Sequence, residues 1–155
     1  MELSKNSKIV QDYLARFNLN LEVIEMPGTT RTAEDAAKAI GCEVGQIVKS
    51  LIFKNVDFPI LCLVSGKNQL NVSKFQETCS IKLEKADANY VKEVTGFSIG
   101  GVPPVAHKTE MKTFIDKDLL DYEIVWAAAG MPFSVFKLFS KDLGMITNGS
   151  IIAIH

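Results

Sequence analysis

The sequence is poor in the residues that build metal and disulfide frameworks. It has three cysteines, Cys42, Cys62 and Cys79, and no two of them are spaced as Cys-x-x-Cys. Only two histidines, His107 and His155, are present. Structural zinc sites draw four ligands from such residues, mostly in paired motifs, so we expect no metal site. Unpaired cysteines also fit reduced thiols in the cytoplasm.

Long hydrophobic runs and a strong charge of either sign are absent as well. No stretch approaches the roughly 20 apolar residues that cross a bilayer, so we expect no membrane span. No apolar block follows Lys5 and Lys8, so we also expect no signal peptide. The formal net charge is −1, whereas proteins that coat nucleic acids are strongly basic. Any contact with RNA should therefore be local, at the end of a strand.

The sequence does contain enough apolar material for a core of its own. Its 155 residues are 47% hydrophobic and suit a single domain over 1–155, with no repeat or linker to divide it. Apolar spacing, caps and glycine stops predict helices over 7–17, 32–40, 71–76 and 88–94. Strands are predicted over 21–26, 47–53, 59–64, 123–127, 134–138 and 150–153, the second and third forming a hairpin. This mixture predicts an α+β fold, with a mixed, largely antiparallel, barrel-like sheet surrounded by helices.

Lys49 is the first candidate for chemistry, because it interrupts one of the most apolar runs of the chain, Ile47–Phe53. A lysine in such a run loses hydration unless its amine reaches water or a partner. The local sequence by itself favours a solvated strand face, where lysines protect sheet edges. The alternative is a cation at the mouth of a pocket, where it would hold a phosphate or a ribose.

The run Gly100–Pro104 is the second candidate and cannot be regular secondary structure, because it pairs two glycines with two prolines. Backbone N–H groups in such a loop can approach a ligand and hold a carbonyl oxygen that becomes charged during acyl transfer. A tight structural turn would use the same residues. A phosphate loop of the Walker type is excluded, because no Gly-Lys-Ser/Thr follows.

The third candidate is the small-residue run Ala127–Gly130, followed by Met131 and Pro132. It fits either a pocket floor or plain packing between elements. No Ser/His/Asp or Cys/His set has a recognisable spacing, and Gly-x-Ser-x-Gly is absent. We therefore interpret His107 as a structural histidine near the glycine loop. No pair of carboxylates indicates glycosidase or metal chemistry.

In this order and spacing, the three runs make the sequence similar to the YbaK/ProX family, the superfamily of prolyl-tRNA synthetase editing domains. The resemblance is carried by Ile47–Phe53, Val94–His107 and Val125–Phe136, and less specifically by Val64–Phe75. Each run alone is a weak signal, whereas the ordered set is specific. The similarity extends from about residue 7 to the end of the chain.

The resemblance implies a free-standing deacylase, which hydrolyses the ester between a wrongly attached amino acid and the 3′-terminal adenosine of tRNA. It implies that Lys49 is the functional lysine and that Gly100 and Pro104, with Gly101 beside them, form the family's glycine-proline loop. We hypothesise that Lys49 anchors the terminal nucleotide while backbone amides around Gly100 to Val102 hold the aminoacyl carbonyl. The resemblance implies aminoacyl-tRNA as partner, a synthetase as a candidate second partner, and no metal or organic cofactor. Further residues are then expected to bind the substrate: Val102, Pro103, Pro104, His107, Ala129, Gly130, Met131 and Phe133.

The sequence departs from the family pattern at three positions. Ala106 stands where glycine is frequent, and Met131 and Phe133 stand where threonine and histidine are frequent. Added bulk and lost polarity would direct the pocket towards small or apolar amino acids, or abolish turnover. Two rival functions remain open: a module that binds tRNA or a synthetase without turnover, and a small hydrolase acting on a different ester.

Overall fold

The computed structural model describes residues 3–154 and has the α+β composition that the sequence predicts. The α-helices are α1 (Lys5–Leu14), α2 (Ala33–Ile40), α3 (Val72–Cys79), α4 (Ala88–Thr95) and α5 (Leu143–Thr147). The short 3-10 helices are η1 (Ala15–Phe17), η2 (Val44–Gln46), η3 (Lys117–Asp121) and η4 (Ser140–Asp142). The strands are β1 (Val23–Glu25), β2 (Ile47–Asn55), β3 (Phe58–Ser65), β4 (Glu84–Lys85), β5 (Lys112–Asp116), β6 (Ile124–Ala128), β7 (Ser134–Phe139) and β8 (Ser150–Ile152).

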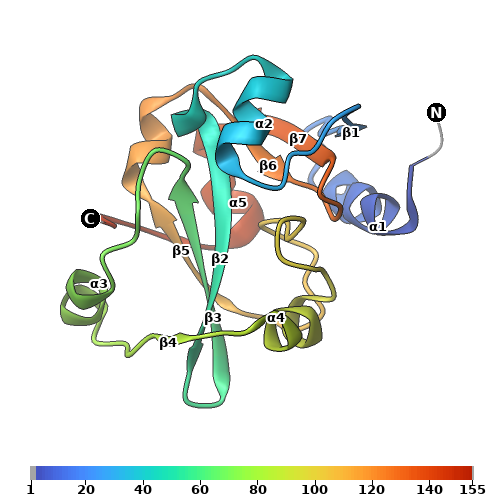
Figure 1. Ribbon diagram of the computed structural model, residues 1–155. Helices are drawn as coiled ribbons and strands as arrows, with labels where there is room; N and C mark the ends of the chain where they lie inside the picture. Colours follow the sequence, from blue (N-terminus) through green and yellow to red (C-terminus); the bar gives the residue numbers. More distant parts are fainter. Residues whose placement is uncertain (1–2, 155) are drawn as a thin grey trace.

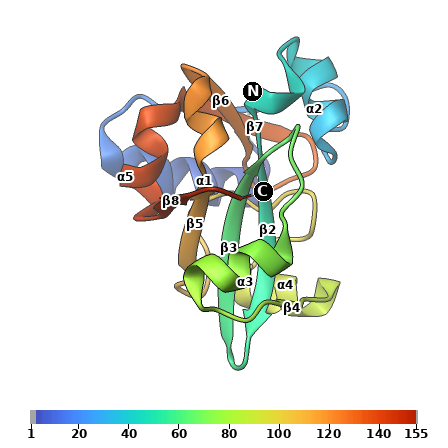
Figure 2. The ribbon, with the colours of Figure 1, turned by 90° about the vertical axis from the view of Figure 1, so that its left-hand side faces the viewer.

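The strands form one eight-stranded mixed sheet in the order β1-β7-β6-β2-β3-β5-β8, with β4 paired to β2 beside that path. Four strand pairs are antiparallel and three are parallel. The β2–β3 hairpin is the longest pairing, and its turn extends beyond the helices in Figures 1 and 2. The predicted mixed sheet with surrounding helices is confirmed. Its path is open, because β1 and β8 are not paired with each other in the described part of the chain.

Side-chain caps and glycines set the helix boundaries. Thr32 and Asn71 each accept a hydrogen bond from the backbone N–H three residues later, at 3.1 and 3.0 Å, and so begin α2 and α3. Gly41 and Gly96 end α2 and α4 with φ of 84° and 85°. Glycine adopts this left-handed conformation without the steric strain of a Cβ atom, so the chain turns sharply at both points.

The β2–β3 hairpin separates two apolar cores, because successive side chains of a strand point to opposite faces. Leu61 and Leu63 of β3 are fully buried in the larger core. Cys62 and Val64, between and beside them, belong to the second core together with Phe75 of α3. A slip of one residue would exchange the two sets, so the register of the hairpin is strongly specified.

A third, small cluster positions α2 against the beginning of β2. Ala33, Ala36 and Ala37 of the helix pack on Ile47 of the strand. Small side chains allow this close approach, and the N-terminal end of α2 therefore lies beside the strand that carries Lys49. No helix within residues 3–154 has the length and apolar character needed to cross a bilayer.

Strand β5 is the main element that the sequence pattern does not predict. Its central residues, Thr113, Phe114 and Ile115, are buried between β3 and β8. The apolar run is short and is flanked by Lys112 and Asp116, so local periodicity gives little signal. The strand is defined by its two parallel partners.

Candidate functional site

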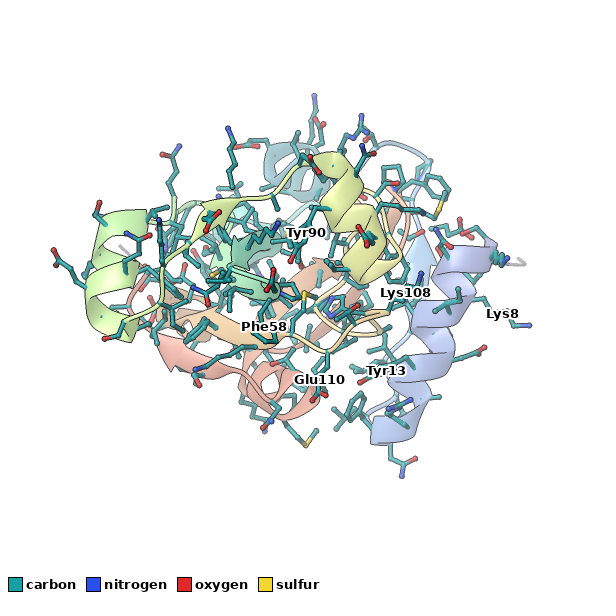
Figure 3. All side chains as sticks on the ribbon, turned by 90° about the horizontal axis from the view of Figure 1, so that it is seen from below. Lys8, Tyr13, Phe58, Tyr90, Lys108 and Glu110 are labelled. Carbon is teal, nitrogen blue, oxygen red and sulfur yellow. The ribbon has the colours of Figure 1, made fainter. Side chains whose placement is uncertain are left out.

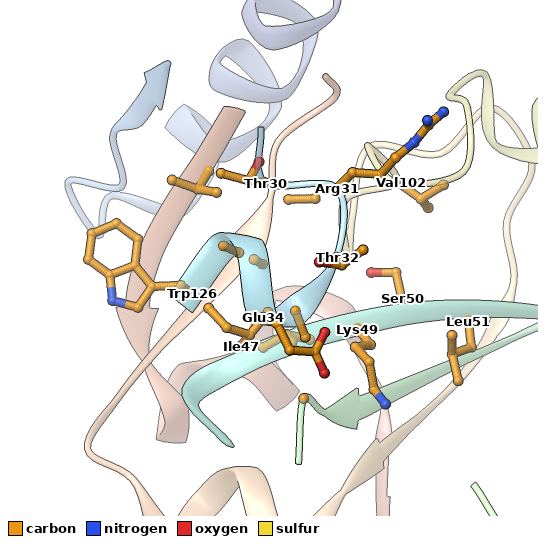
Figure 4. A pocket seen from close by; sticks show the side chains of 18 of the residues that line it. Thr30, Arg31, Thr32, Glu34, Ile47, Lys49, Ser50, Leu51, Val102 and Trp126 are labelled. Atoms are coloured by element: carbon orange, nitrogen blue, oxygen red, sulfur yellow. The ribbon is translucent and has the colours of Figure 1, made fainter. Parts of the chain in front are cut away.

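A cavity of about 310 Å³ opens between α2, β2, β6 and the glycine loop (Figure 4). It brings together Lys49 of β2 with Gly100 and Val102 of the loop, although about fifty residues separate them in the sequence. Ala127 and Ala128 of β6 form part of the same wall. The lysine, the glycine loop and the beginning of the small-residue run, three separate signals in the sequence, therefore meet at one place.

Lys49 is half-buried, and its ammonium is already engaged. Nζ donates a hydrogen bond to the backbone carbonyl of Asn68. Burial lowers the pKa of Lys49 below its usual value, and the carboxylates of Glu34 and Asp116 partly oppose that shift. In Figure 4 the Glu34 side chain faces Lys49 from α2. A partly desolvated cation at a cavity wall is suited to binding an anionic or strongly polar ligand group.

The glycine loop is shaped by two different steric demands. Gly100 has φ of 95°, and a Cβ atom there would lie 2.6 Å from Cγ of Arg31. A Cβ atom at Gly101 would lie 3.1 Å from the carbonyl carbon of Gly130. Neither position accepts a side chain without displacement of its surroundings. The loop can therefore lie directly beneath Arg31 and against the backbone that precedes Met131.

The backbone amides of the loop divide into occupied and available donors. Gly101 N–H donates to the Ser98 carbonyl at 2.9 Å, and the Gly101 carbonyl accepts from Gly130 N–H at 2.9 Å. Within residues 3–154, the N–H groups of Gly100 and Val102 have no hydrogen-bond acceptor. Among the loop amides in residues 3–154, these two are therefore the candidate donors to a ligand oxygen, whereas Gly101 ties the loop to its neighbours.

Two hydroxyl groups lining the cavity lack partners. Thr30 Oγ1 and Ser50 Oγ are buried and form no hydrogen bond within the described residues. Leaving a buried hydroxyl unpaired costs about 1–3 kcal/mol, which marks both as candidate ligand contacts. In Figure 4 the Ser50 hydroxyl and the Lys49 amine point to opposite sides of β2, as alternation along a strand requires.

The other predicted substrate-binding residues lie outside this cavity. They are Pro103, Pro104, His107, Ala129, Gly130, Met131 and Phe133. Pro104 and His107 line a second cavity of about 900 Å³. That cavity is on the face shown in Figure 3, where Tyr13, Lys108 and Glu110 are labelled. The substrate-binding roles assigned to these seven positions therefore remain predictions without a contact to the Lys49 cavity.

His107 has a structural environment. Its Nε2 lies 2.6 Å from the Pro103 carbonyl oxygen, and Nε2 must carry the proton because a carbonyl only accepts. Burial lowers the pKa of His107 below its usual value. A neutral imidazole that braces the proline loop fits the structural histidine inferred from the sequence.

The cavity offers no activated nucleophile. None of the three cysteines lines it, and burial raises the pKa of Cys62 to about 12. The Ser50 hydroxyl has no hydrogen-bonded base. Within residues 3–154, no three or more His, Cys, Asp or Glu side chains are grouped as metal ligands. The remaining chemistry is orientation by a cation, free amides and hydroxyls, which suits attack by water on an activated ester.

Sequence reasoning missed several residues of the site. Thr30 and Arg31 enter the cavity from the segment before α2, and Asn68 approaches Lys49 from the loop after β3. The run Thr29-Thr30-Arg31-Thr32 was a polar signal, because it follows the point where Pro27 and Gly28 end the predicted strand. Nothing local links it to Lys49, because tertiary packing of α2 on β2 creates that proximity.

Comparisons with known proteins found a matching family model and several similar proteins. The family model for the "Aminoacyl-tRNA editing domain" matches residues 28–145. The "Uncharacterized protein YwhH" of Bacillus subtilis is 31% identical over 137 residues, covering 88% of this chain and 87% of the relative. The "Putative Cys-tRNA(Pro)/Cys-tRNA(Cys) deacylase EbsC" of Enterococcus faecalis is 25% identical over 125 residues, covering 79% of this chain and 76% of the relative.

The chain also resembles one part of a larger enzyme and a solved structure. It is 32% identical over 117 residues to the "Proline--tRNA ligase" of a Thermoanaerobacter species, covering 74% of this chain but only 20% of the ligase. A crystal structure of "a putative trans-editing enzyme for prolyl tRNA synthetase" superposes with a TM-score of 0.93 at 44% identity. That superposition covers 99% of this chain and 98% of the other.

Proposed function

This chain belongs to the aminoacyl-tRNA editing domain family, and we propose that it hydrolyses the ester between a wrongly attached amino acid and the 3′-terminal adenosine of a tRNA. The family inferred from the sequence is thereby confirmed. The observation that carries the proposed activity is the single cavity in which Lys49, Gly100 and Val102 meet. Those three residues come from two of the runs that carry the family resemblance, Ile47–Phe53 and Val94–His107.

The proposed mechanism uses water as the nucleophile. The free N–H groups of Gly100 and Val102 would hold the aminoacyl carbonyl and stabilise the oxyanion as water adds. The bond between that carbon and the ribose oxygen then breaks, and the ribose oxygen takes up a proton released by the attacking water. An aminoacyl ester is already activated, so positioning alone supplies much of the acceleration. Attack by water on a positioned ester agrees with a cavity that lacks an activated serine or cysteine.

Polar and cationic groups would hold the terminal nucleotide. Lys49 supplies an ammonium at the cavity wall, and the exposed Arg31 guanidinium lies over the glycine loop. Arginine binds phosphate oxygens in a bidentate manner, so we assign Arg31 to a phosphate of the CCA end. The unpaired hydroxyls of Thr30 and Ser50 would complete the polar contacts. These four groups would bind the end of the tRNA at one place. Such local binding does not require the strongly basic surface that a net charge of −1 excludes.

The apolar part of the cavity would sort amino acids. Ala33, Ala36 and Ala127 present small, buried side chains to it. Pockets of this kind separate side chains that differ by one methylene only weakly, which is why a second hydrolytic step improves the accuracy of charging. The family departures Met131 and Phe133 lie outside the cavity, so they give little support to a module that binds without turnover.

The partners follow from the same proposal. Relatives include proline ligases and a structure named for trans-editing, so we propose tRNA charged by prolyl-tRNA synthetase as the substrate, with that synthetase as a candidate partner. The chain spans about a fifth of the length of the proline–tRNA ligase. We therefore do not propose that it attaches proline to tRNA. Charged tRNA occurs in the cytoplasm, which is the compartment we propose.

The proposal is tested with a panel of tRNAs charged with cysteine, alanine, serine, threonine or proline. Release of the amino acid is followed at physiological salt with purified protein. We expect rapid hydrolysis of one or two wrongly charged tRNAs of the panel. A tRNA that carries its own correct amino acid should not be hydrolysed. If every tRNA of the panel stays charged while the protein still binds tRNA, the hydrolase is excluded. The function that remains is a module that binds tRNA without turnover. Cleavage of simple esters that charged tRNA does not inhibit would indicate a different hydrolase.

A further inference from the structure

A buried carboxylate organises the loop that follows β3. Asp116, the last residue of β5, has 0% of its surface exposed. One of its oxygens accepts hydrogen bonds from Ser65 N–H at 3.0 Å and from Asn68 Nδ2 at 2.8 Å. Its other oxygen accepts from Asp118 N–H at 2.9 Å. A buried carboxylate is tolerated here because these donors replace its water molecules. The same hydrogen bonds fix the donor residues and therefore the loop that carries them.

Asn68 connects this carboxylate to Lys49. Its Nδ2 also donates to Asp118 Oδ2 at 2.9 Å, so the side-chain amide is shared between two carboxylates. Its backbone N–H donates to the Ser65 carbonyl at 2.9 Å. With both ends of the residue fixed, its backbone carbonyl has a defined place, and that carbonyl accepts the hydrogen bond from Lys49 Nζ.

Two carboxylates, Glu34 and Asp116, act electrostatically on Lys49. Glu34 approaches from α2, and Asp116 lies beneath the Asn68 loop at the end of β5. Both carboxylates favour the charged ammonium against the effect of burial. Lysine has a long, flexible stem, so an ammonium without a fixed acceptor would occupy many positions. The acceptor here is rigid because of residues that do not line the cavity.

We propose that Asn68 and Asp116 are positioning residues, which fix the carbonyl that holds the Lys49 ammonium at the cavity wall. This inference rests on the proposed role of Lys49 in deacylation and extends it to residues that never touch the substrate. It requires that the loss of the Asn68 side chain acts through Lys49 and not through the fold as a whole. That requirement separates it from a purely structural role.

The first test reads the position of Lys49 without any enzymatic assay. Lysines are acylated with an amine-selective reagent, and each site is quantified by mass spectrometry. In Asn68→Ala, labelling of Lys49 should rise about fivefold, the factor expected when one hydrogen bond is released. Labelling of the exposed Lys8 on α1, outside this hydrogen-bond network, should not change. The neighbouring exposed variant Gln69→Ala is the matched control and should leave Lys49 as in the wild type.

The second test is a double-mutant cycle on deacylation under single-turnover conditions. Asn68→Ala should lower the rate about tenfold in the wild-type background but less than about twofold in Lys49→Ala. Asn68→Ser, which keeps one short donor, should give an intermediate rate. Thermal melting of each variant confirms that it is folded.

The outcomes distinguish the two proposals. If Lys49→Ala deacylates as fast as wild type, the proposed function of the lysine fails, while the labelling experiment still decides its positioning. If deacylation depends on Lys49 but Asn68→Ala slows both backgrounds equally, Asn68 is only structural. Unchanged labelling of Lys49 in folded Asn68→Ala would overturn the inference outright.

Discussion

Removal of the Arg31 guanidinium should weaken tRNA binding in a manner that depends on salt. Arg31 is exposed at the cavity, and its side chain lies over Gly100, where a Cβ atom would approach Cγ to 2.6 Å. If the guanidinium contacts a phosphate of the CCA end, binding releases the counterion of that phosphate. The affinity then falls with salt, and Arg31→Ala removes that part of the dependence.

The magnitude follows from counterion release. Each neutralised phosphate of a single strand contributes about 0.7 to the slope of log affinity against log salt. For two contacts, Arg31 and Lys49, affinity should fall about sevenfold between roughly 50 and 200 mM salt. With Lys49 alone it should fall only about threefold over the same range. The slope itself should therefore become less steep by about 0.7 in Arg31→Ala.

The assay is fluorescence titration of an RNA oligonucleotide ending in CCA at four salt concentrations. The chain's other arginine, Arg16, is the matched control, because it is exposed and stacks on Tyr13 at 3.8 Å, outside the cavity. Arg16→Ala should keep the wild-type slope. A slope that is equally steep in Arg31→Ala and wild type would refute the phosphate contact, even if the affinity had changed.

Three further predictions concern the loop and the core. Burial keeps the pKa of folded His107 below its ordinary 6.5, so the unfolded chain binds the proton first. Stability should therefore fall as the pH drops from above 6.5 towards the lower folded pKa, and thermal melts of His107→Gln should show a shallower fall. Gly100→Ala places a side chain at φ of 95°, which costs about 1–2 kcal/mol, and should reduce kcat/KM, whereas Gly144→Ala, with open space around it, should not. Phe75→Ala should lower the free energy of unfolding by about 3–5 kcal/mol in urea titrations, because Phe75 is fully buried and packs edge-on against Phe114.

Local signals were sufficient for the elements with caps, stops or strong periodicity. The β2–β3 hairpin, the Thr32 cap and the glycine stops at Gly41 and Gly96 all occur as predicted. Each of these is decided by residues within a few positions of one another. Strand β5 was missed because its apolar run is short and its stability comes from parallel partners far away in the sequence.

The site was predictable only as a set of motifs. Lys49, Gly100 and Val102 were singled out by unusual local chemistry, and the fold brings them to one cavity. The roles of Arg31 and Asn68 could not be read from the sequence, because packing of α2 on β2 and the hydrogen bonds to Asp116 place them. Residues that act through tertiary contacts leave no periodic or motif signal.

The dependence of deacylation on Lys49 tests the account most directly. Single-turnover hydrolysis of the tRNA substrate that the panel identifies would be compared among wild type, Lys49→Ala and Lys54→Ala. Lys54 is a matched control, because it lies on the same strand but outside the cavity. The account predicts a loss of about a hundredfold or more in Lys49→Ala and wild-type rates in Lys54→Ala. Equal rates in all three proteins would contradict it.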